Sequence, residues 1–227
     1  EVSEAAKQPL SVHYIDVGQG DSILIKSEGL NVLIDAGERG NGETILSYLE
    51  AQNVKSLDYV IATHPHSDHI GSMADVLKKI PVANVIMPKL TQKNTPTTKT
   101  YENFLQAVKD SGAKVITATP GETYSGKRAA LTILGPCQQD DDLNNMSVVA
   151  RLDFGSTSFL FTGDAETPSE NAILKKGMDV HADVLKMGHH GSRTSSGNAF
   201  LDKVQPAFCV ISCGTGNDYG HPHKETL

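Results

Sequence analysis

Residues 58–72, with the sequence DYVIATHPHSDHIGS, restrict the possible folds of this chain more than any other stretch. An apolar, β-branched run leads into His64 and His66, and Asp68 and His69 follow where a helical pattern begins. Three of the nine histidines in the chain therefore stand within six positions. Metal sites made of imidazole and carboxylate groups need three or four donors at about 2 Å. One loop cannot complete two such sites, so we expect the fold to bring donors from other strand ends to this edge.

Polar residues are also common in loops and at helix N-termini, and Asp68 could be only a helix cap. That explanation suits a lone histidine better than it suits the pattern His-x-His-x-Asp-His. Further candidate donors stand directly after other apolar runs, and these are Asp35 in NVLIDAG, Asp164 in SFLFTGD, and His189 and His190 in DVLKMGHH. A single aspartate at a strand end is more often a turn residue. Several of them beside the histidine cluster favour a metal site.

Short runs rich in apolar and β-branched residues recur along the chain and alternate with helical patterns. This alternation predicts one α/β domain over residues 11–227, in which helices cover sheets, after a flexible lead-in over residues 1–10. A weak echo between DYVIATHPHSDHIGS and ADVLKMGHHGSRTSS indicates two similar halves. If these halves pack sheet against sheet, their histidine clusters could meet at one edge.

Three helical patterns are clear enough to predict details. Residues 69–80 predict one helix, and residues 100–112 predict another with Leu105 on its buried face. Thr167 and Glu170 have the spacing of a capping box at the start of a third helix.

Composition excludes some classes of function. The formal net charge of −7 argues against a broad basic face that binds nucleic acid by electrostatics alone. Cys137, Cys209 and Cys213 lack the spacing of a metal knuckle, and we expect them to be small core residues or incidental thiols. No apolar run approaches the roughly 18 residues of a membrane span, so we expect no membrane insertion of this piece.

The motif His-x-His-x-Asp-His, followed downstream by TGD and GHHGS, resembles the metallo-β-lactamase superfamily. The segments HYIDVGQGDSILI, NVLIDAG, SVVARL, FTGDAE, LKMGHHGS and YGHPH resemble its ComEC/Rec2 branch, the C-terminal domain of competence proteins, from about Ser11 to Leu227. The resemblance implies a four-layer αββα sandwich of the α/β class, with a dinuclear site at one edge of its paired sheets.

The resemblance further implies two divalent metal ions, whose protein ligands would be His64, His66, Asp68, His69, Asp164 and His190. The first two would hold one ion, the next two and His190 would hold the other, and Asp164 would bridge both. Asp35 would orient a ligand from behind the site. Either His189 or His190 could be the ligand, and we favour His190.

Members of the superfamily usually supply one more histidine to the first ion from mid-chain, where this chain has DDLNNMSVVARL. The first ion would then have three protein ligands and the second four. We therefore expect unequal occupancy, with the second ion held more tightly. Residue 66 is histidine, whereas di-iron oxidoreductases of the superfamily carry glutamate there, which favours a hydrolytic zinc or manganese site.

The implied reaction is hydrolysis by a metal-activated hydroxide, because metal binding lowers the pKa of water by several units. Asp68 would ligate a metal and hold the hydroxide in line. His189 would hydrogen-bond to the substrate or protonate the leaving oxygen.

Candidate substrate contacts are Gln19, Arg193, His221 and His223. The loop DVGQGDS around Gln19 is equally explained as a hairpin connection that needs positive φ at its glycines. His221 and His223 repeat the two-apart spacing of the cluster, and they could instead cap a surface helix. The other basic residues, such as Lys127, Arg128 and Lys186, are scattered, and we expect most of them on the solvated surface.

Three functions compete. The first is a metal-dependent phosphodiesterase, most specifically a nuclease that acts on DNA. The second is a small-substrate phosphodiesterase that resembles phosphorylcholine esterases. The acidic net charge of the chain suits this function better than it suits tight binding of DNA. The third is a non-catalytic module that binds metal and contacts DNA. Kinship with a competence channel would place the chain outside the cytoplasm or at a membrane.

Overall fold

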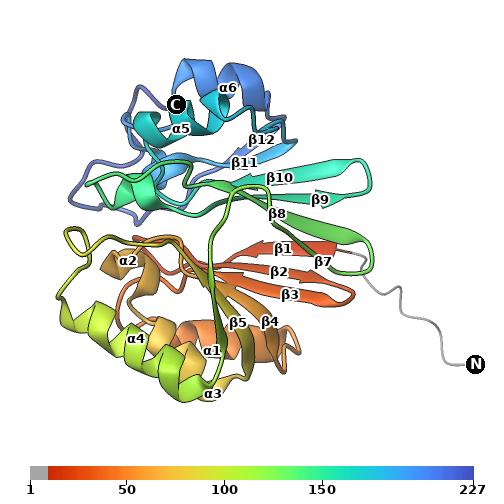
Figure 1. Ribbon diagram of the computed structural model, residues 1–227, viewed down its shortest axis with the longest axis vertical. Helices are drawn as coiled ribbons and strands as arrows, with labels where there is room; N and C mark the ends of the chain where they lie inside the picture. The colour runs from red at the N-terminus through yellow and green to blue at the C-terminus, as the bar shows by residue number, and fades with distance from the viewer. Residues whose placement is uncertain (1–9) are drawn as a thin grey trace, which may run out of the picture.

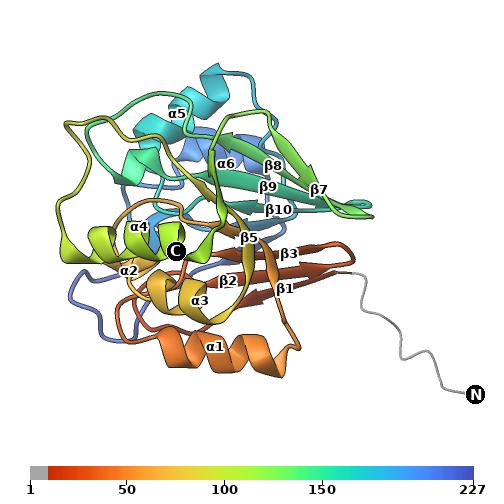
Figure 2. The ribbon, with the colours of Figure 1, turned by 60° about the horizontal axis from the view of Figure 1, so that its bottom comes forward.

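The computed structural model describes residues 10–227, which fold into four layers (Figure 1). Two six-stranded sheets pack face to face, and helices cover the outer face of each sheet, as Figure 2 shows from a second side. The predicted αββα sandwich is confirmed. All of the predicted lead-in except Leu10 lies outside the described residues. Within them, no helix has the length and apolar character needed to cross a membrane.

The first sheet has the strand order β1-β2-β3-β4-β5-β6. Its strands are β1 (Leu10–Tyr14), β2 (Ile23–Ser27), β3 (Leu30–Ile34), β4 (Leu57–Ile61), β5 (Val82–Met87) and β6 (Lys114–Thr117). The first three pair antiparallel, and β3 to β6 run parallel. The outer face of this sheet is covered by α1 (Gly42–Ala51), α2 (Ser67–Ile70), α3 (Met73–Lys79) and α4 (Lys99–Ser111).

The second sheet has the order β12-β11-β10-β9-β8-β7. Its strands are β7 (Thr123–Ser125), β8 (Ala129–Gly135), β9 (Val149–Phe154), β10 (Thr157–Phe161), β11 (Val184–Lys186) and β12 (Phe208–Val210). Strands β7 to β10 pair antiparallel, whereas β10, β11 and β12 are parallel. Helices α5 (Thr167–Lys175) and α6 (Asn198–Val204) cover it, and two 3₁₀ turns, η1 (Asn144–Met146) and η2 (Gly188–Gly191), lie at the sheet edge.

Strand alternation builds the core on both sides of each sheet. In β2, Ile23 and Ile25 belong to the core cluster between the sheets, which also contains Phe161, while Leu24 between them belongs to the cluster under the helical layer. A separate apolar cluster lies under α5 and α6. The three cysteines are free: Cys209 is exposed, Cys213 is partly buried, and Cys137 is partly buried and packs against this last cluster.

The first two predicted helices differ from the observed ones in one respect each. Residues 69–80 span the end of α2 and all of α3 instead of one helix. Between the two helices, at Gly71, the chain packs tightly against backbone distant in the sequence, where a Cβ would lie 2.4 Å from the backbone nitrogen of Arg39. Leu105 is 40% exposed because the buried stripe of α4 runs through Tyr101, Phe104 and Val108. Its predicted stop is present, however, as Gly112 takes the left-handed conformation with φ 70°.

The predicted capping box at α5 is wrong, because the helix begins one residue earlier than the pattern requires. Glu166 is the N-cap residue, and the side-chain oxygen of Asn145 accepts the N–H groups of Glu166 and Ser169. The Glu170 carboxylate instead accepts the backbone N–H groups of Ser196 and Gly197, which ties α5 to the segment that follows η2.

Candidate metal centre

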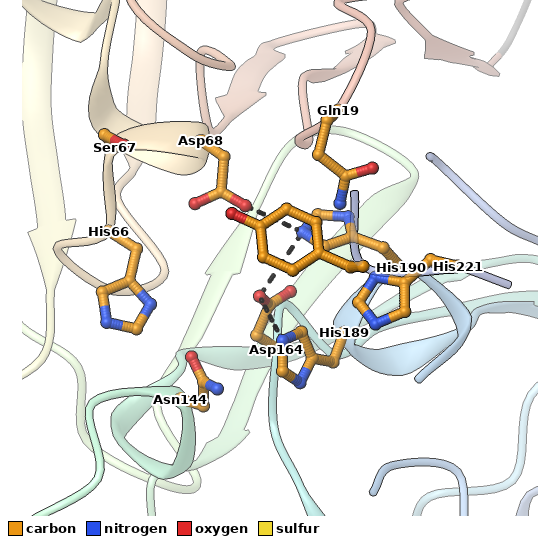
Figure 3. A pocket seen from close by; sticks show the side chains of 10 residues that line it. Gln19, His66, Ser67, Asp68, Asn144, Asp164, His189, His190 and His221 are labelled. Carbon is orange, nitrogen blue, oxygen red and sulfur yellow. Dashed lines mark hydrogen bonds and ion pairs between the residues drawn. The ribbon is translucent and has the colours of Figure 1, made fainter. Parts of the chain in front are cut away.

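One edge of the sandwich gathers the polar side chains that follow the strands. His64 comes from the connection between β4 and α2, and His69 comes from α2 itself. Asp164 follows β10, and His190 lies in η2 after β11. All four side chains are buried. The two halves of the chain therefore meet at this edge, where Figure 3 shows Asp68 and Asp164 turned toward His190.

Four donors form a cage with the dimensions of a metal site. The Nε2 atom of His69 lies 3.3 Å from Nε2 of His190 and 3.2 Å from Oδ2 of Asp164. Nε2 of His190 lies 3.4 Å from Oδ2 of Asp164 and 3.1 Å from Oδ2 of Asp68. Ligands bound tetrahedrally at about 2.1 Å would be separated by about 3.4 Å. Nε2 of His69 lies 3.8 Å from Oδ2 of Asp68, and all four donor atoms lie within 4.8 Å of one another, so the cage has the dimensions of a site for one divalent cation.

Hydrogen bonds behind the cage fix both imidazole rings for ligation. His69 donates its Nδ1–H to Asp35 over 2.7 Å, and His190 donates its Nδ1–H to the Ser212 carbonyl oxygen over 2.9 Å. The lone pairs of both Nε2 atoms consequently face each other and two carboxylates. These four hydrogen-bond acceptors lie together in one buried space, so a positive charge among them would stabilise the arrangement. Histidines that bind metals typically donate their other ring N–H to an acceptor in this way.

The pKa values of the cage residues reflect the same demand for positive charge. Burial alone would lower the pKa of His190, but Asp164 and Asp68 raise it to about 9. Burial would raise the pKa of Asp164, yet His69 and His190 hold it well below its usual range. The Oδ1 atom of Asp164 is buried and has no hydrogen-bond partner among the described residues.

A second corner of the same edge has fewer donors. Nε2 of His64 lies 3.0 Å from Nδ1 of His66 and 3.8 Å from Oδ2 of Asp164. Thr63 donates its hydroxyl to Asp35, so its oxygen can accept from Nδ1 of His64 at 3.2 Å, which leaves Nε2 of His64 free to ligate. This corner has the two histidines and the aspartate predicted for the first ion.

Asp35 lies where the sequence indicated, directly behind the cage. It is fully buried, and its carboxylate accepts the Thr63 N–H at 2.8 Å and the Thr63 hydroxyl at 2.6 Å in addition to the His69 ring. Its backbone has φ 58°, an uncommon conformation for a residue other than glycine. The short turn after β3 thus directs the carboxylate at the ring of a candidate ligand.

Lys186 is an exception to the expectation that most of the scattered basic residues are solvated. This last residue of β11 is fully buried, and its ammonium group forms an ion pair with Asp21 and donates to the Gly163 carbonyl oxygen at 3.3 Å. Asp21, Asp35 and His69 are also close enough to one another to suggest a second metal group. The Lys186 ammonium already supplies the positive charge there, so we assign no ion to it.

His189 differs from its neighbour in orientation and exposure. Its Nδ1 lies 3.0 Å from Oε1 of Glu166, and its Nε2 lies 3.8 Å from Oδ2 of Asp164. Both histidines have left-handed backbone conformations, with φ 47° and 54°, and such strain is concentrated at functional sites. Sequence reasoning missed Glu166, although its place directly after TGDA, at the start of a helix, was visible.

A cavity of about 310 Å³ opens in front of these groups (Figure 3). Its lining residues are Gln19, His66, Ser67, Asp68, Asn144, Asp164, His189, His190, Tyr219 and His221. Of the predicted substrate contacts, Gln19 and His221 line this cavity, whereas Arg193 and His223 do not. Arg193 is exposed, and its backbone N–H donates to Nδ1 of His223 at 3.0 Å.

The chain has sequence relatives that match it over nearly its whole length, but it covers only part of their length. A family model described as the metallo-beta-lactamase superfamily matches residues 15–214. ComE operon protein 3 of Bacillus subtilis (strain 168) is 34% identical over 235 residues, which cover 95% of this chain and 30% of that protein. Recombination protein 2 of Haemophilus influenzae is 31% identical over 231 residues, which cover 99% of this chain and 27% of that protein. The chain thus spans less than a third of these relatives.

Solved structures support the same fold. The metallo-beta-lactamase fold protein YhfI from Bacillus subtilis superposes with a TM-score of 0.58 at 18% identity, covering 96% of this chain and 92% of YhfI. CmlA, a diiron beta-hydroxylase from Streptomyces venezuelae, superposes with a TM-score of 0.59 at 17% identity, covering 94% of this chain and 48% of CmlA. At these identities the likeness shows the fold alone.

Proposed function

Because the chain belongs to the metallo-β-lactamase superfamily, in its ComEC/Rec2-like branch, we propose that it is a metal-dependent phosphodiesterase that cleaves DNA. The observation that carries this proposal is the cage of Asp68, His69, Asp164 and His190, which opens onto a polar cavity. We propose two divalent ions, zinc or manganese, with the caged position filled more tightly than the corner formed by His64 and His66.

Divalent ions bound here would supply Lewis acidity, neutralise phosphate charge and make water a nucleophile near neutral pH. Asp68 is the partly exposed member of the cage, so its carboxylate can face both a ligated ion and the cavity. His190 and His69 hold its pKa below the ordinary value, although burial alone would raise it. Asp68 therefore stays ionised and can accept a hydrogen bond that orients the attacking water.

His189 is placed to handle a proton on the leaving side. Its ring lines the cavity, and Glu166 fixes the ring from behind through Nδ1. Thr194 donates its hydroxyl to the same Glu166 oxygen at 2.8 Å, which holds the carboxylate in place. Nε2 of His189 is then the atom that can hydrogen-bond to a phosphate oxygen or protonate a leaving alkoxide.

Tyr219 favours nucleic acid over a small ester. Its ring is 66% exposed at the cavity, and it stacks on His221 with a centroid distance of 5.6 Å and an interplanar angle of 20°. Asn217 holds this loop, because its side chain accepts the N–H groups of Tyr219 and His221 and donates to the His221 carbonyl oxygen. An exposed aromatic ring on a fixed loop suits stacking of an unpaired base.

Charge favours the alternative, a small-substrate phosphodiesterase. The net charge is −7, and no lysine or arginine is among the residues of the described chain that line this cavity. Without a basic groove, attraction between the protein and the phosphates of a long DNA would add little to the binding affinity. Binding would then depend on the metal ions and on base stacking.

The decisive assay offers single-stranded DNA and bis(p-nitrophenyl) phosphate separately to protein loaded with manganese or zinc. The proposal expects cleavage of both, loss of both in Asp68→Ala, and selective loss of DNA cleavage in Tyr219→Ala but not in Tyr219→Phe. Activity on the small ester alone would support the alternative. Tight metal binding with no hydrolysis of either substrate would leave a non-catalytic metal-binding module.

A further inference from the structure

We propose that Asn144 supplies an amide oxygen ligand to the ion at His64, His66 and Asp164. This oxygen would make the position favour manganese over zinc. The inference rests on the proposed function, because it concerns the weaker of the two metal positions.

Asn144 has a buried oxygen that needs a partner. The residue is 8% exposed, and its Oδ1 atom forms no hydrogen bond with any residue that the structure describes. An unsatisfied buried amide oxygen is costly, and such groups in folded proteins commonly mark a missing ligand or ion. Asn144 lines the same cavity as His66 and Asp164, and Figure 3 shows its side chain directed into it.

The backbone around Asn144 is held firmly at this place. Its N–H donates to Oδ1 of Asp142 at 3.0 Å, and its carbonyl oxygen accepts the Ser147 N–H at 3.0 Å. Ser147 in turn accepts the Asp164 N–H at 3.1 Å, and its hydroxyl lies 3.3 Å from Nδ1 of His64. The turn η1 is therefore joined to two candidate ligands.

The chemistry of the donors sets the metal preference. Imidazole suits zinc, whereas carboxylate and carbonyl oxygens suit magnesium, calcium and manganese. With Asn144, the corner offers two imidazoles and two oxygen donors in place of three imidazoles and one oxygen. Zinc should lose more from this exchange than manganese, because it gains less from a neutral oxygen.

Titration calorimetry of metal-free protein with Mn²⁺ and Zn²⁺ separately tests the assignment. The wild type should bind two Mn²⁺ ions in distinguishable steps. Loss of a supporting group at a metal site typically costs 10–100-fold in affinity, so Asn144→Ala should weaken only the weaker Mn²⁺ step by at least about tenfold. Asn144→His should strengthen Zn²⁺ relative to Mn²⁺ at that step, and Asn144→Asp should retain Mn²⁺.

Two further variants separate this inference from the proposed function. Asn103→Ala changes an exposed asparagine of α4 and should leave both steps unchanged. His190→Ala should remove the tighter step, which belongs to the cage. Unchanged two-step Mn²⁺ binding in Asn144→Ala, or a single Mn²⁺ step in the wild type, would overturn the role of Asn144. Either result would leave the caged ion in place, and the first would also leave the proposed two-ion site intact.

Discussion

Replacing Lys186 with methionine should destabilise the fold severely, because it removes the counter-charge of a buried carboxylate. Lys186 is fully buried and Asp21 is 2% exposed, and the Oδ1 atom of Asp21 has no hydrogen-bond partner within the described chain. Breaking a buried ion pair by removing one partner costs about 3–5 kcal/mol. For a domain of about 150–250 residues, each kcal/mol shifts the Tm by about 2–4 °C, so the expected fall is about 6–20 °C.

Urea and thermal unfolding of the metal-free protein near pH 7 measure this cost. Lys203→Met, at an exposed position of α6, controls for the change of side chain and should shift the Tm little. The double variant Lys186→Met with Asp21→Asn should regain much of the lost stability, because no unpaired charge stays buried. The reasoning would be refuted if the free energy of unfolding of Lys186→Met were less than about 1 kcal/mol below that of Lys203→Met, or if the double variant were no more stable than Lys186→Met.

Three further outcomes follow from the site. Asp35→Asn should weaken metal binding about 10–100-fold, since the ring of His69 loses its fixed acceptor, and titration calorimetry measures this directly. His189→Ala should lower kcat by about 100-fold or more with metal binding unchanged, and Glu166→Gln should lower it less, as steady-state kinetics on bis(p-nitrophenyl) phosphate would show. Burial raises the pKa of Glu170 to about 7 from its ordinary value of 4.5. The folded chain therefore binds more protons than the unfolded chain between these values, and its free energy of unfolding should fall as the pH rises through this window. Urea unfolding of Glu170→Gln at several pH values should lack this part of the pH dependence.

The sandwich could be predicted because the strand pattern and the histidine motif agree. Alternation such as that of Ile23, Leu24 and Ile25 requires apolar layers on both sides of a sheet. Residues 64–69 cannot complete two metal sites alone, so the ends of other strands must lie beside the end of the strand that precedes them. The split of residues 69–80 into two helices could not be predicted, because it depends on the contact of Gly71 with backbone distant in the sequence.

The site was predictable where a residue directly follows a strand. Asp35 directly follows β3, and Asp164 comes three residues after β10. Asp164 belongs to the cage, and Asp35 lies behind it. The burial of Lys186 was not predicted, because it depends on Asp21, which lies in the loop between β1 and β2, far away in the sequence. Glu166 and Asn144 were missed for a similar reason: their meaning comes from the ring or cavity that tertiary packing places beside them.

The central claim is that donors from both halves of the chain hold a divalent cation at one edge of the sandwich. Anomalous diffraction from crystals soaked in Mn²⁺, recorded on both sides of the manganese absorption edge, tests it most directly. The account predicts the strongest peak between Asp68, His69, Asp164 and His190. No peak there at saturating Mn²⁺, or a strongest peak at the exposed Asp141 and Asp142, would contradict it.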